Sequence, residues 1–445
     1  SYTGPFRSGE QESGKMQKES MARKVVQILA LGVAGGSIYL IPYVRYVFYD
    51  WQIAAMGISN TQIGLLTTAY TIGNMILYIP GGVIADKYNT KKCILASLLL
   101  TTALTLIFAF TMGSFTLAMI IWALFSVTTT FLFWDSLFKT LRLIADEDEQ
   151  GTLFGLYYMM NGFTGAAGSW LGLKLAGSFG TTDHEKFFWA VIAYAIATAV
   201  AALLVALLLD GDKGGERLAR KTEGETFQMS QVRDLLKNPT VWCFALIVFC
   251  GYALYSSTSY FTPYLTDVKG ISAEDSGMLT ILRSYIFYFM APISGLIADK
   301  LFKSTTKWFI VLFTVMAVLY VGVLIIPSSA SVGFVSFYTL LPGLFGLALY
   351  GIIFSIASEI RIPAVVMGTA VGLASIIGYL PDAFMATMFG HWLDKFGNSG
   401  YNYIFMYLLA MSIIGLALVI AVRIRARKMD KAEAAAEGKG TEAAE

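Results

Sequence analysis

The sequence predicts an all-α membrane protein whose twelve transmembrane helices form two pseudo-symmetric halves of six. Of its 445 residues, 56% are hydrophobic and only 14% are charged, whereas soluble domains carry about 25% charged residues. Twelve apolar runs are each long enough to cross a hydrocarbon layer of about 30 Å as a helix. The second half of the chain also repeats motifs of the first. This composition excludes a water-soluble enzyme, a nucleic-acid binder and a disordered chain.

One long polar loop divides the predicted spans into two sets of six. The loop, 210–239, is rich in charge and glycine, and its end, 227–237, is expected to form a short amphipathic helix on the membrane surface. We predict an N-terminal segment 1–23, a first bundle 24–209, a second bundle 240–424 and a solvated low-complexity tail 425–445. The predicted spans are 24–48, 61–85, 92–112, 116–140, 152–178, 187–209, 240–265, 274–298, 307–327, 332–358, 364–390 and 403–423.

The basic residues predict the orientation of the chain. An even number of spans places both termini on one side, and with the N-terminus inside, 26 of the 32 Lys and Arg residues lie in inner segments. The outer loops hold only Lys186, Lys269 and Lys395. By the positive-inside rule both termini are cytoplasmic, and the membrane is expected to be a bacterial inner membrane. The net charge of +2 indicates no polyanionic partner.

No chemistry beyond transport is visible in the sequence. Cys93, Cys243 and Cys250 all lie in apolar runs, which is typical of inert buried thiols. The chain contains no Cys/His cluster, no phosphate-binding loop and no paired nucleophile and base. We therefore expect no metal, no cofactor, no intrinsic ATP hydrolysis and no enzymatic activity.

The two halves share motifs at two constant offsets. The triplet Gly57–Ser59 recurs at Gly270–Ser272, a shift of 213, and the same shift brings Asp86 onto Asp299. Gly151–Leu156 matches Gly368–Leu373 at a shift of 217. Glycines that pack helices explain isolated matches, but they do not explain an Ile-Ala-Asp-Lys that occurs twice. The pattern predicts an internal duplication.

The loop after the second span resembles the signature loop of the major facilitator superfamily. Its sequence is Gly82-Val-Ile-Ala-Asp86-Lys87-Tyr-Asn-Thr-Lys91-Lys, and Asn89 stands where the family has a second glycine. Asn tolerates a left-handed turn, so we expect the turn to survive. The resemblance implies a gate on the cytoplasmic face, formed by both copies of the motif: Gly82, Asp86, Lys87, Lys91, Gly295, Asp299 and Lys300.

The family resemblance implies a secondary transporter in which two halves rock about a central cavity. Tyr43-Val-Arg45, the stretch 134–151 and the segment 263–269 resemble the organic-anion and sugar-phosphate permease branch. That branch pairs an Arg in helix 1 with an Arg in helix 7, and here the second position falls near Leu254. The helix-5 His of the branch falls on Asn161, and the Gly-Pro pattern of drug antiporters is incomplete.

Charges within the spans mark the candidate binding site, because each costs several kcal/mol to insert. Arg283 lies about ten residues into its span, near the middle of the membrane, where it either binds substrate or forms a structural ion pair. Arg45 binds substrate or extends to the interface. Asp382 neutralises an arginine or carries a proton. Asp135 either takes part in coupling or pairs with Lys139, one helical turn away.

Polar and aromatic side chains complete the predicted site. Asn161 and the tyrosines, each of which offers a flat face and a hydroxyl, would orient the ligand: Tyr39, Tyr43, Tyr158, Tyr255 and Tyr379. The first hypothesis is a monomeric secondary transporter of a small organic anion, such as a sugar acid, carboxylate or phosphorylated metabolite, driven by a proton or substrate gradient. The alternatives are an exporter of amphipathic or cationic compounds and a transporter-like membrane sensor.

Overall fold

The computed structural model describes residues 20–144, 150–210, 237–359 and 367–442, all in helices and the turns that join them. Residues 227–236, most of the predicted surface helix, lie outside the described residues. In the first half the helices are α1 (Met21–Ile38), α2 (Arg45–Met56), α3 (Asn60–Lys87), α4 (Thr90–Thr111), α5 (Phe115–Ser126), the π-helix η1 (Val127–Trp134), α6 (Asp135–Ile144), α7 (Gln150–Phe179) and α8 (Asp183–Leu208).

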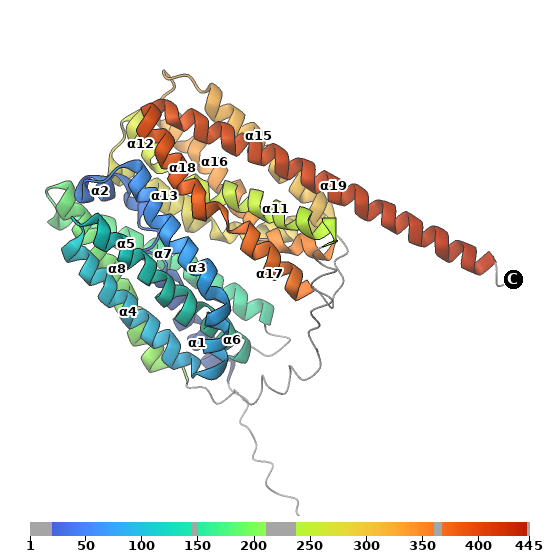
Figure 1. The fold of residues 1–445 in the computed structure, drawn as a ribbon, viewed down its shortest axis with the longest axis horizontal. Coiled ribbons are helices and arrows are strands. Elements are labelled where there is room, and N and C mark those ends of the chain that lie inside the picture. The colour runs from blue at the N-terminus through green and yellow to red at the C-terminus, as the bar shows by residue number, and fades with distance from the viewer. Residues whose placement is uncertain (1–19, 145–149, 211–236, 360–366, 443–445) are drawn as a thin grey trace, which may run out of the picture.

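The second half lies beside the first (Figure 1). Its helices are α11 (Pro239–Ser256), η2 (Ser257–Tyr260), α12 (Phe261–Lys269), α13 (Ala273–Ser284), η3 (Ile286–Phe289), α14 (Met290–Leu296), η4 (Ile297–Phe302), α15 (Thr305–Ile325), α16 (Val332–Tyr350), η5 (Ile353–Ser358), α17 (Met367–Gly378), α18 (Pro381–Phe396), η7 (Gly397–Ser399) and α19 (Gly400–Glu442).

These helices make twelve membrane crossings. Among the described residues, nine helical stretches are long and apolar enough to span a bilayer, and the last of them, Leu373–Lys428, runs through two successive crossings. Helices α3 and α7, of 28 and 30 residues, supply the other two. The prediction ended the final span at residue 423, but α19 continues to Glu442. The added turns are rich in Ala, Glu and Lys, which favour helix without any packing partner.

Several crossings are interrupted near their middles. The first is divided at Tyr39–Val44, between α1 and α2, and the eleventh is divided at Tyr379–Leu380, between α17 and α18. Each interruption contains or precedes a proline, Pro42 or Pro381, which cannot donate a backbone hydrogen bond. The eighth crossing breaks at Tyr285, where φ is −123° and ψ is −48°. In transporters such broken helices surround the binding site.

The internal duplication is visible in backbone geometry. Gly57 ends α2 with φ at 63°, and Gly270 ends α12 with φ at 67°, a conformation that costs glycine little. Two residues later, Ser59 and Ser272 each accept a hydrogen bond from the backbone N–H three residues on, which begins α3 and α13. Identical local chemistry thus starts the second crossing of each half.

The buried side chains follow the two halves. Two clusters lie within α1–α8, one around Trp122 and Phe125 and the other around Phe133 and Leu137. A third, larger cluster lies within α11–α19. The few side chains that cross over, such as Ile281 of α13, belong to the part of the second half that touches the first.

The two halves meet along one side of the molecule. Asp394 of α18 accepts hydrogen bonds from the backbone amides of Asn60 and Thr61, at 2.9 and 2.7 Å, so it caps the N-terminus of α3. Lys186 of α8 pairs with Glu274 of α13 at 3.1 Å. In Figure 1, α2, α12 and α13 lie together at this end, whereas α6 and α17 lie apart at the other.

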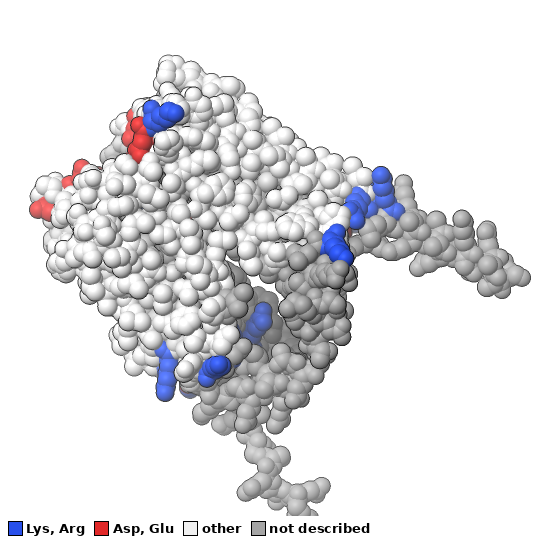
Figure 2. Space-filling model, viewed as in Figure 1, with Lys and Arg blue, Asp and Glu red and all other residues white. Residues whose placement is uncertain are grey.

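Lys and Arg gather at the separated end. Figure 2 shows them along the lower edge and beside the end of α19, whereas Asp and Glu lie at the upper left together with further Lys or Arg atoms. We name the first side the basic face and the side with Asp394, Lys186 and Glu274 the opposite face. All hydrogen bonds between described residues that join the two halves lie on the opposite face or midway through the membrane.

Candidate functional site

The interrupted helices bring a carboxylate and an arginine into the space between the halves. Asp382 lies in the first turn of α18, directly after the break, and its side chain accepts a hydrogen bond from the Tyr252 hydroxyl at 2.5 Å. The Tyr43 hydroxyl, from the break in the first crossing, donates to the same oxygen at 3.4 Å. Asp382 is 6% exposed. One buried carboxylate therefore joins the first, seventh and eleventh crossings.

Arg45 is the positive charge beside this carboxylate. It begins α2, is 5% exposed and acts electrostatically on Asp382. Its guanidinium carbon lies 5.1 Å from the ring centroid of Tyr260 and 5.3 Å from that of Tyr46, within the range of a cation–π contact. Among the described residues, its Nε has no hydrogen-bond partner. A buried donor left in this state costs about 1–3 kcal/mol, which a bound acceptor would remove.

Half-buried tyrosines line the second half next to this pair. The rings of Tyr255 and Tyr350 stack with centroids 4.5 Å apart, and Tyr379 meets Tyr252 edge-on at 4.7 Å. Their hydroxyls form two pairs, Tyr255 with Tyr288 and Tyr350 with Tyr379, each at 3.1 Å. We name Tyr255, Tyr288, Tyr350 and Tyr379 the tyrosine wall. It offers flat apolar faces together with hydroxyls that can donate or accept.

The predicted residues of the first half lie around the same region. Tyr43 packs against Tyr70, with centroids 5.6 Å apart. The Asn161 amide donates to the Tyr157 hydroxyl at 3.2 Å. Tyr158 is 45% exposed, and the Tyr39 hydroxyl donates to the backbone carbonyl of Thr129 at 3.4 Å. Tyr39 is therefore tied to the fourth crossing, while Tyr158 has the most open surface of the set.

Arg283 is placed differently from Arg45. Its guanidinium donates to the carbonyls of Thr339 and Thr258, each at 3.2 Å, and to the Thr339 hydroxyl at 3.3 Å. It is 1% exposed and lies 5.5 Å from the Phe261 ring centroid. All these partners belong to the second half, and none is a carboxylate. In this conformation Arg283 braces the seventh, eighth and tenth crossings, and no hydrogen bond joins it to Asn161 among the described residues.

Asp135 lies toward the basic face, between the second and fourth crossings. A Cβ added at Gly81 would come within 3.0 Å of an Asp135 carboxylate oxygen, so the carboxylate fits against a glycine of α3. Lys139 donates to the backbone carbonyl of Ala85, also in α3, at 2.8 Å. Both residues thus connect α6 to α3, and the Asp135–Lys139 ion pair stays a prediction.

The signature loop departs from its expected geometry at Asn89. This residue has φ −63° and ψ 118°, and its side chain accepts a hydrogen bond from the backbone N–H of Lys92. The expectation of a left-handed turn at Asn89 is wrong, because Asn here caps the N-terminus of α4, a role it fills well. In the second copy a left-handed residue does occur, at Lys303, with φ 52°.

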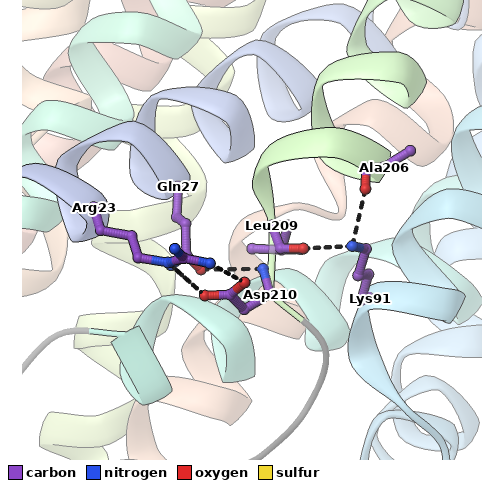
Figure 3. A network of polar contacts seen from close by, with 6 residues as sticks. All are labelled: Arg23, Gln27, Lys91, Ala206, Leu209 and Asp210. Carbon is purple, nitrogen blue, oxygen red and sulfur yellow. Dashed lines mark hydrogen bonds and ion pairs between the residues drawn. The ribbon is translucent and has the colours of Figure 1, made fainter. Parts of the chain in front are cut away.

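Lys91 of the loop closes the base of the first half (Figure 3). Its ammonium donates to the carbonyls of Ala206 and Leu209, at 3.0 and 2.5 Å, at the C-terminus of α8, where a cation is favourable. Beside it, Arg23 of α1 pairs with Asp210 at 2.6 Å. Lys87, Asp299 and Lys300 are exposed, and Gly295 makes only ordinary contact with Ile352. The side chain of Asp86 lies outside the described residues, so the gate stays a prediction.

Five residues of the site were missed in the sequence: Tyr46, Tyr252, Tyr260, Tyr288 and Tyr350. Tyr43 and Tyr46, like Tyr252 and Tyr255, are three residues apart and so share one helical face. That spacing was the available signal. Tyr350 had none, because its stacking partner is 95 residues away in the sequence. Among the described residues, no group of three or more His, Cys, Asp or Glu side chains could hold a metal ion.

Twelve crossings with broken helices at a central charged site define a membrane transporter. The family model of the Major Facilitator Superfamily matches residues 27–386, and the chain belongs to this family. It is therefore a multi-pass membrane protein and a secondary transporter with a small-molecule substrate, and not an enzyme.

Its relatives include bacterial proteins of similar length. The chain is 29% identical to the inner membrane protein YqcE of Escherichia coli over 397 residues, covering 88% of this chain and 92% of that protein. It is 24% identical to the glycerol-3-phosphate transporter of Bacillus subtilis, covering 83% and 86%. A bacterial homolog of the human lysosomal transporter Spinster, inward-facing and unoccupied, superposes with a TM-score of 0.68 at 16% identity, covering 93% and 99%.

Proposed function

We propose that this transporter moves a small organic anion, which binds to Arg45 between the two halves and is driven by a proton or substrate gradient. One observation carries the proposal: the buried Arg45 guanidinium, beside the gap in the first crossing, has an Nε with no hydrogen-bond partner in the described part of the chain. Arg matches the geometry of carboxylate and phosphate groups. The name of the distant glycerol-3-phosphate transporter is consistent with an anionic substrate.

Asp382 is the group we assign to proton coupling. Its carboxylate accepts hydrogen bonds from Tyr252 and Tyr43 and is attracted electrostatically to Arg45. An ionised Asp382 competes with an incoming anion for Arg45. A proton on the carboxylate removes that competition, so anion and proton bind together. Tyr43 and Asp382 belong to different halves. Protonation of Asp382 therefore changes the strength of the Tyr43–Asp382 hydrogen bond, which must break when the halves rock.

The conformation fits a transporter that opens to the basic face. Between described residues, the hydrogen bonds that join the halves lie midway or on the opposite face. If the basic face is cytoplasmic, as the positive-inside rule predicts, this is an inward-facing state in a bacterial inner membrane. We propose that the functional unit is a monomer, with one six-helix bundle over 24–209 and the other over 240–424.

Uptake into proteoliposomes tests the assignment. Labelled carboxylates, sugar acids and phosphate esters are offered with and without an inward proton gradient. We expect uptake of at least one anion, stimulated by the gradient, and a loss of at least tenfold in Arg45→Gln. Lys174→Gln is the matched control, because Lys174 is an exposed cation over Trp170 in α7. Anion uptake that survives Arg45→Gln contradicts the assignment.

The same assay separates the alternatives. Transport of cations or amphipathic compounds that depends on Asp382, without anion transport, would indicate an exporter. Saturable ligand binding without flux in either direction would indicate a sensor.

A further inference from the structure

The central site contains one available positive charge. Arg45 and Asp382, 5% and 6% exposed, are opposite charges in the same buried region. With Asp382 ionised, the empty site is neutral. Binding of a singly charged anion together with one proton on the Asp382 carboxylate leaves it neutral again. Net charge matters here, because an unpaired charge withdrawn from water into a low-dielectric interior is strongly disfavoured.

Arg283 does not add a second charge to this site. Three of its contacts are hydrogen bonds to Thr258 and Thr339, and its side chain is enclosed with 1% exposure. The other basic residues of the described spans lie elsewhere. Lys174 is exposed over Trp170, and Lys139 is bonded to the carbonyl of Ala85 near the basic face.

The remaining walls are neutral and hydroxyl-rich. The tyrosine wall presents two hydroxyl pairs, Tyr255 with Tyr288 and Tyr350 with Tyr379. Each hydroxyl can donate and accept, so each pair can open to bond to hydroxyls of a ligand. The stacked rings of Tyr255 and Tyr350 supply an apolar face. These walls suit a hydroxylated carbon skeleton better than a second charged group.

From this arrangement we infer that the substrate is a monoanion with a hydroxylated body, of the sugar-acid type, and not a doubly charged phosphate ester. The inference rests on the proposed function and narrows it. A phosphate monoester at pH 7.5 has lost its second proton, whose pKa is about 6, and carries close to two negative charges. With Arg45 and a protonated Asp382 it would leave the occluded site at −1. A sulfate ester of the same sugar carries one charge at every pH of interest.

Matched sulfate and phosphate esters test the inference on the full-length protein in detergent at pH 7.5. The probes are D-glucose 6-sulfate against D-glucose 6-phosphate, glycerol 3-sulfate against glycerol 3-phosphate, and D-glucuronate as the carboxylate. Isothermal titration gives each dissociation constant, and the ligand-dependent rise in unfolding temperature gives an independent measure. We expect the monoanion of a pair to bind at least tenfold more tightly than its dianion.

Two variants test which residues determine the preference for the monoanion. Arg45→Gln is expected to abolish binding of every anion. Asp382→Asn mimics the protonated, neutral carboxylate, so the occluded site still accepts only one negative charge and the preference for the monoanion is expected to persist. Lys174→Gln should preserve the wild-type preference.

The outcomes distinguish the two proposals. If a phosphate ester binds as tightly as its sulfate partner, the charge limit is wrong while anion transport stands. If none of the five anions binds, both proposals fail. If the preference disappears in Asp382→Asn, whose site has the same charge as the protonated wild type, the net-charge argument fails and the inference is overturned.

Discussion

Two arginines of similar burial have opposite surroundings. Arg45 has an unpartnered Nε, two aromatic faces and a carboxylate nearby. Arg283 is surrounded by backbone carbonyls and threonine hydroxyls, and a Cβ added at Gly343 would meet its Cγ at 2.1 Å. The first arrangement leaves hydrogen-bonding capacity for a ligand. The second uses that capacity to hold three crossings of one half together.

Replacement of Arg283 by methionine is therefore expected to lower stability. The change removes charged hydrogen bonds worth about 1.5–3 kcal/mol each and leaves the carbonyls of Thr258 and Thr339 without their donors. We expect the unfolding temperature of the purified protein to fall by several degrees. Lys174→Gln, an exposed charge change measured in parallel, should leave the unfolding temperature nearly unchanged. Equal temperatures for Arg283→Met and the wild type would contradict the bracing role.

From the sequence, both arginines were predicted to be charges within the membrane spans, but their different contacts could not be predicted. Insertion cost depends on depth, and depth can be counted along a helix. The partners of Arg283 are 25 and 56 residues away, and a single sequence carries no trace of such pairings. Asp382 was predicted to neutralise Arg45 or Arg283 or to carry a proton. The break before α18 turns it toward Tyr252 and Tyr43, which no periodicity predicts.

At the scale of elements, the seam between α3 and α18 joins the halves on the opposite face. Asp394 bonds the backbone and side chains of Asn60 and Thr61. Farther along, the hydroxyls of Thr68 and Thr387 are 2.8 Å apart. A helix cap of this kind contributes about 0.5–2 kcal/mol. The seam must part when the transporter opens to this side.

A disulfide across the seam is expected to arrest the transporter. In a variant without Cys93, Cys243 and Cys250, the pair Thr68→Cys and Thr387→Cys would place two sulfurs where hydroxyls now touch. Oxidation should cross-link them and reduce uptake to background, and a reducing agent should restore it. The single Thr68→Cys variant is the control. Full transport by the cross-linked protein would mean that the seam does not open.

Asp394→Asn should weaken the same seam. Loss of the charged cap corresponds to a shift of about 2- to 30-fold in the equilibrium constant for closing the seam. Because cross-linking requires the closed seam, we expect the oxidative cross-linking of the cysteine pair to slow by at most that factor.

Glu359 caps the N-terminus of α15 outside the membrane spans, and its contribution to stability depends on pH. Partial burial alone would raise the pKa of Glu359, but the amides of Thr306 and Thr305 and nearby hydroxyls outweigh it and hold the pKa below its usual range. Such a carboxylate stabilises the fold above its unfolded pKa of about 4.3, and the contribution is lost as pH falls through the lower folded value. Glu359→Gln should lower the unfolding temperature at pH 7. The difference from the wild type should shrink as the pH falls below the unfolded pKa and disappear once the pH is below the lower folded pKa.

At the scale of the whole molecule, duplication explains more of the fold than any single motif. Gly57 and Gly270 adopt the same left-handed conformation, followed by the same serine cap. All twelve predicted spans correspond to crossings, because apolar length is a strong local signal. The interruptions at 39–44 and 379–380 were not predicted, since polar groups exposed by a break are satisfied by residues distant in the chain.

The orientation is tested by protease digestion. With the basic face in the cytoplasm, the tail beyond α19 should resist protease added to intact cells and be removed in inverted membrane vesicles. An epitope at the C-terminus reports both. Removal of the epitope from intact cells would reverse the assignment of the two faces.

The closeness of the seam has a practical consequence for capturing other states of this protein. A methyl group at Gly64 would lie 2.4 Å from the carbonyl oxygen of Ala386, and one at Gly390 would lie 2.1 Å from that of Asn60. Neither clash exists once α3 and α18 separate. Alanine at either position therefore acts as a wedge that penalises one state and spares the other. Such variants would favour the outward-open form without any ligand and offer a route to crystals of it or antibodies against it.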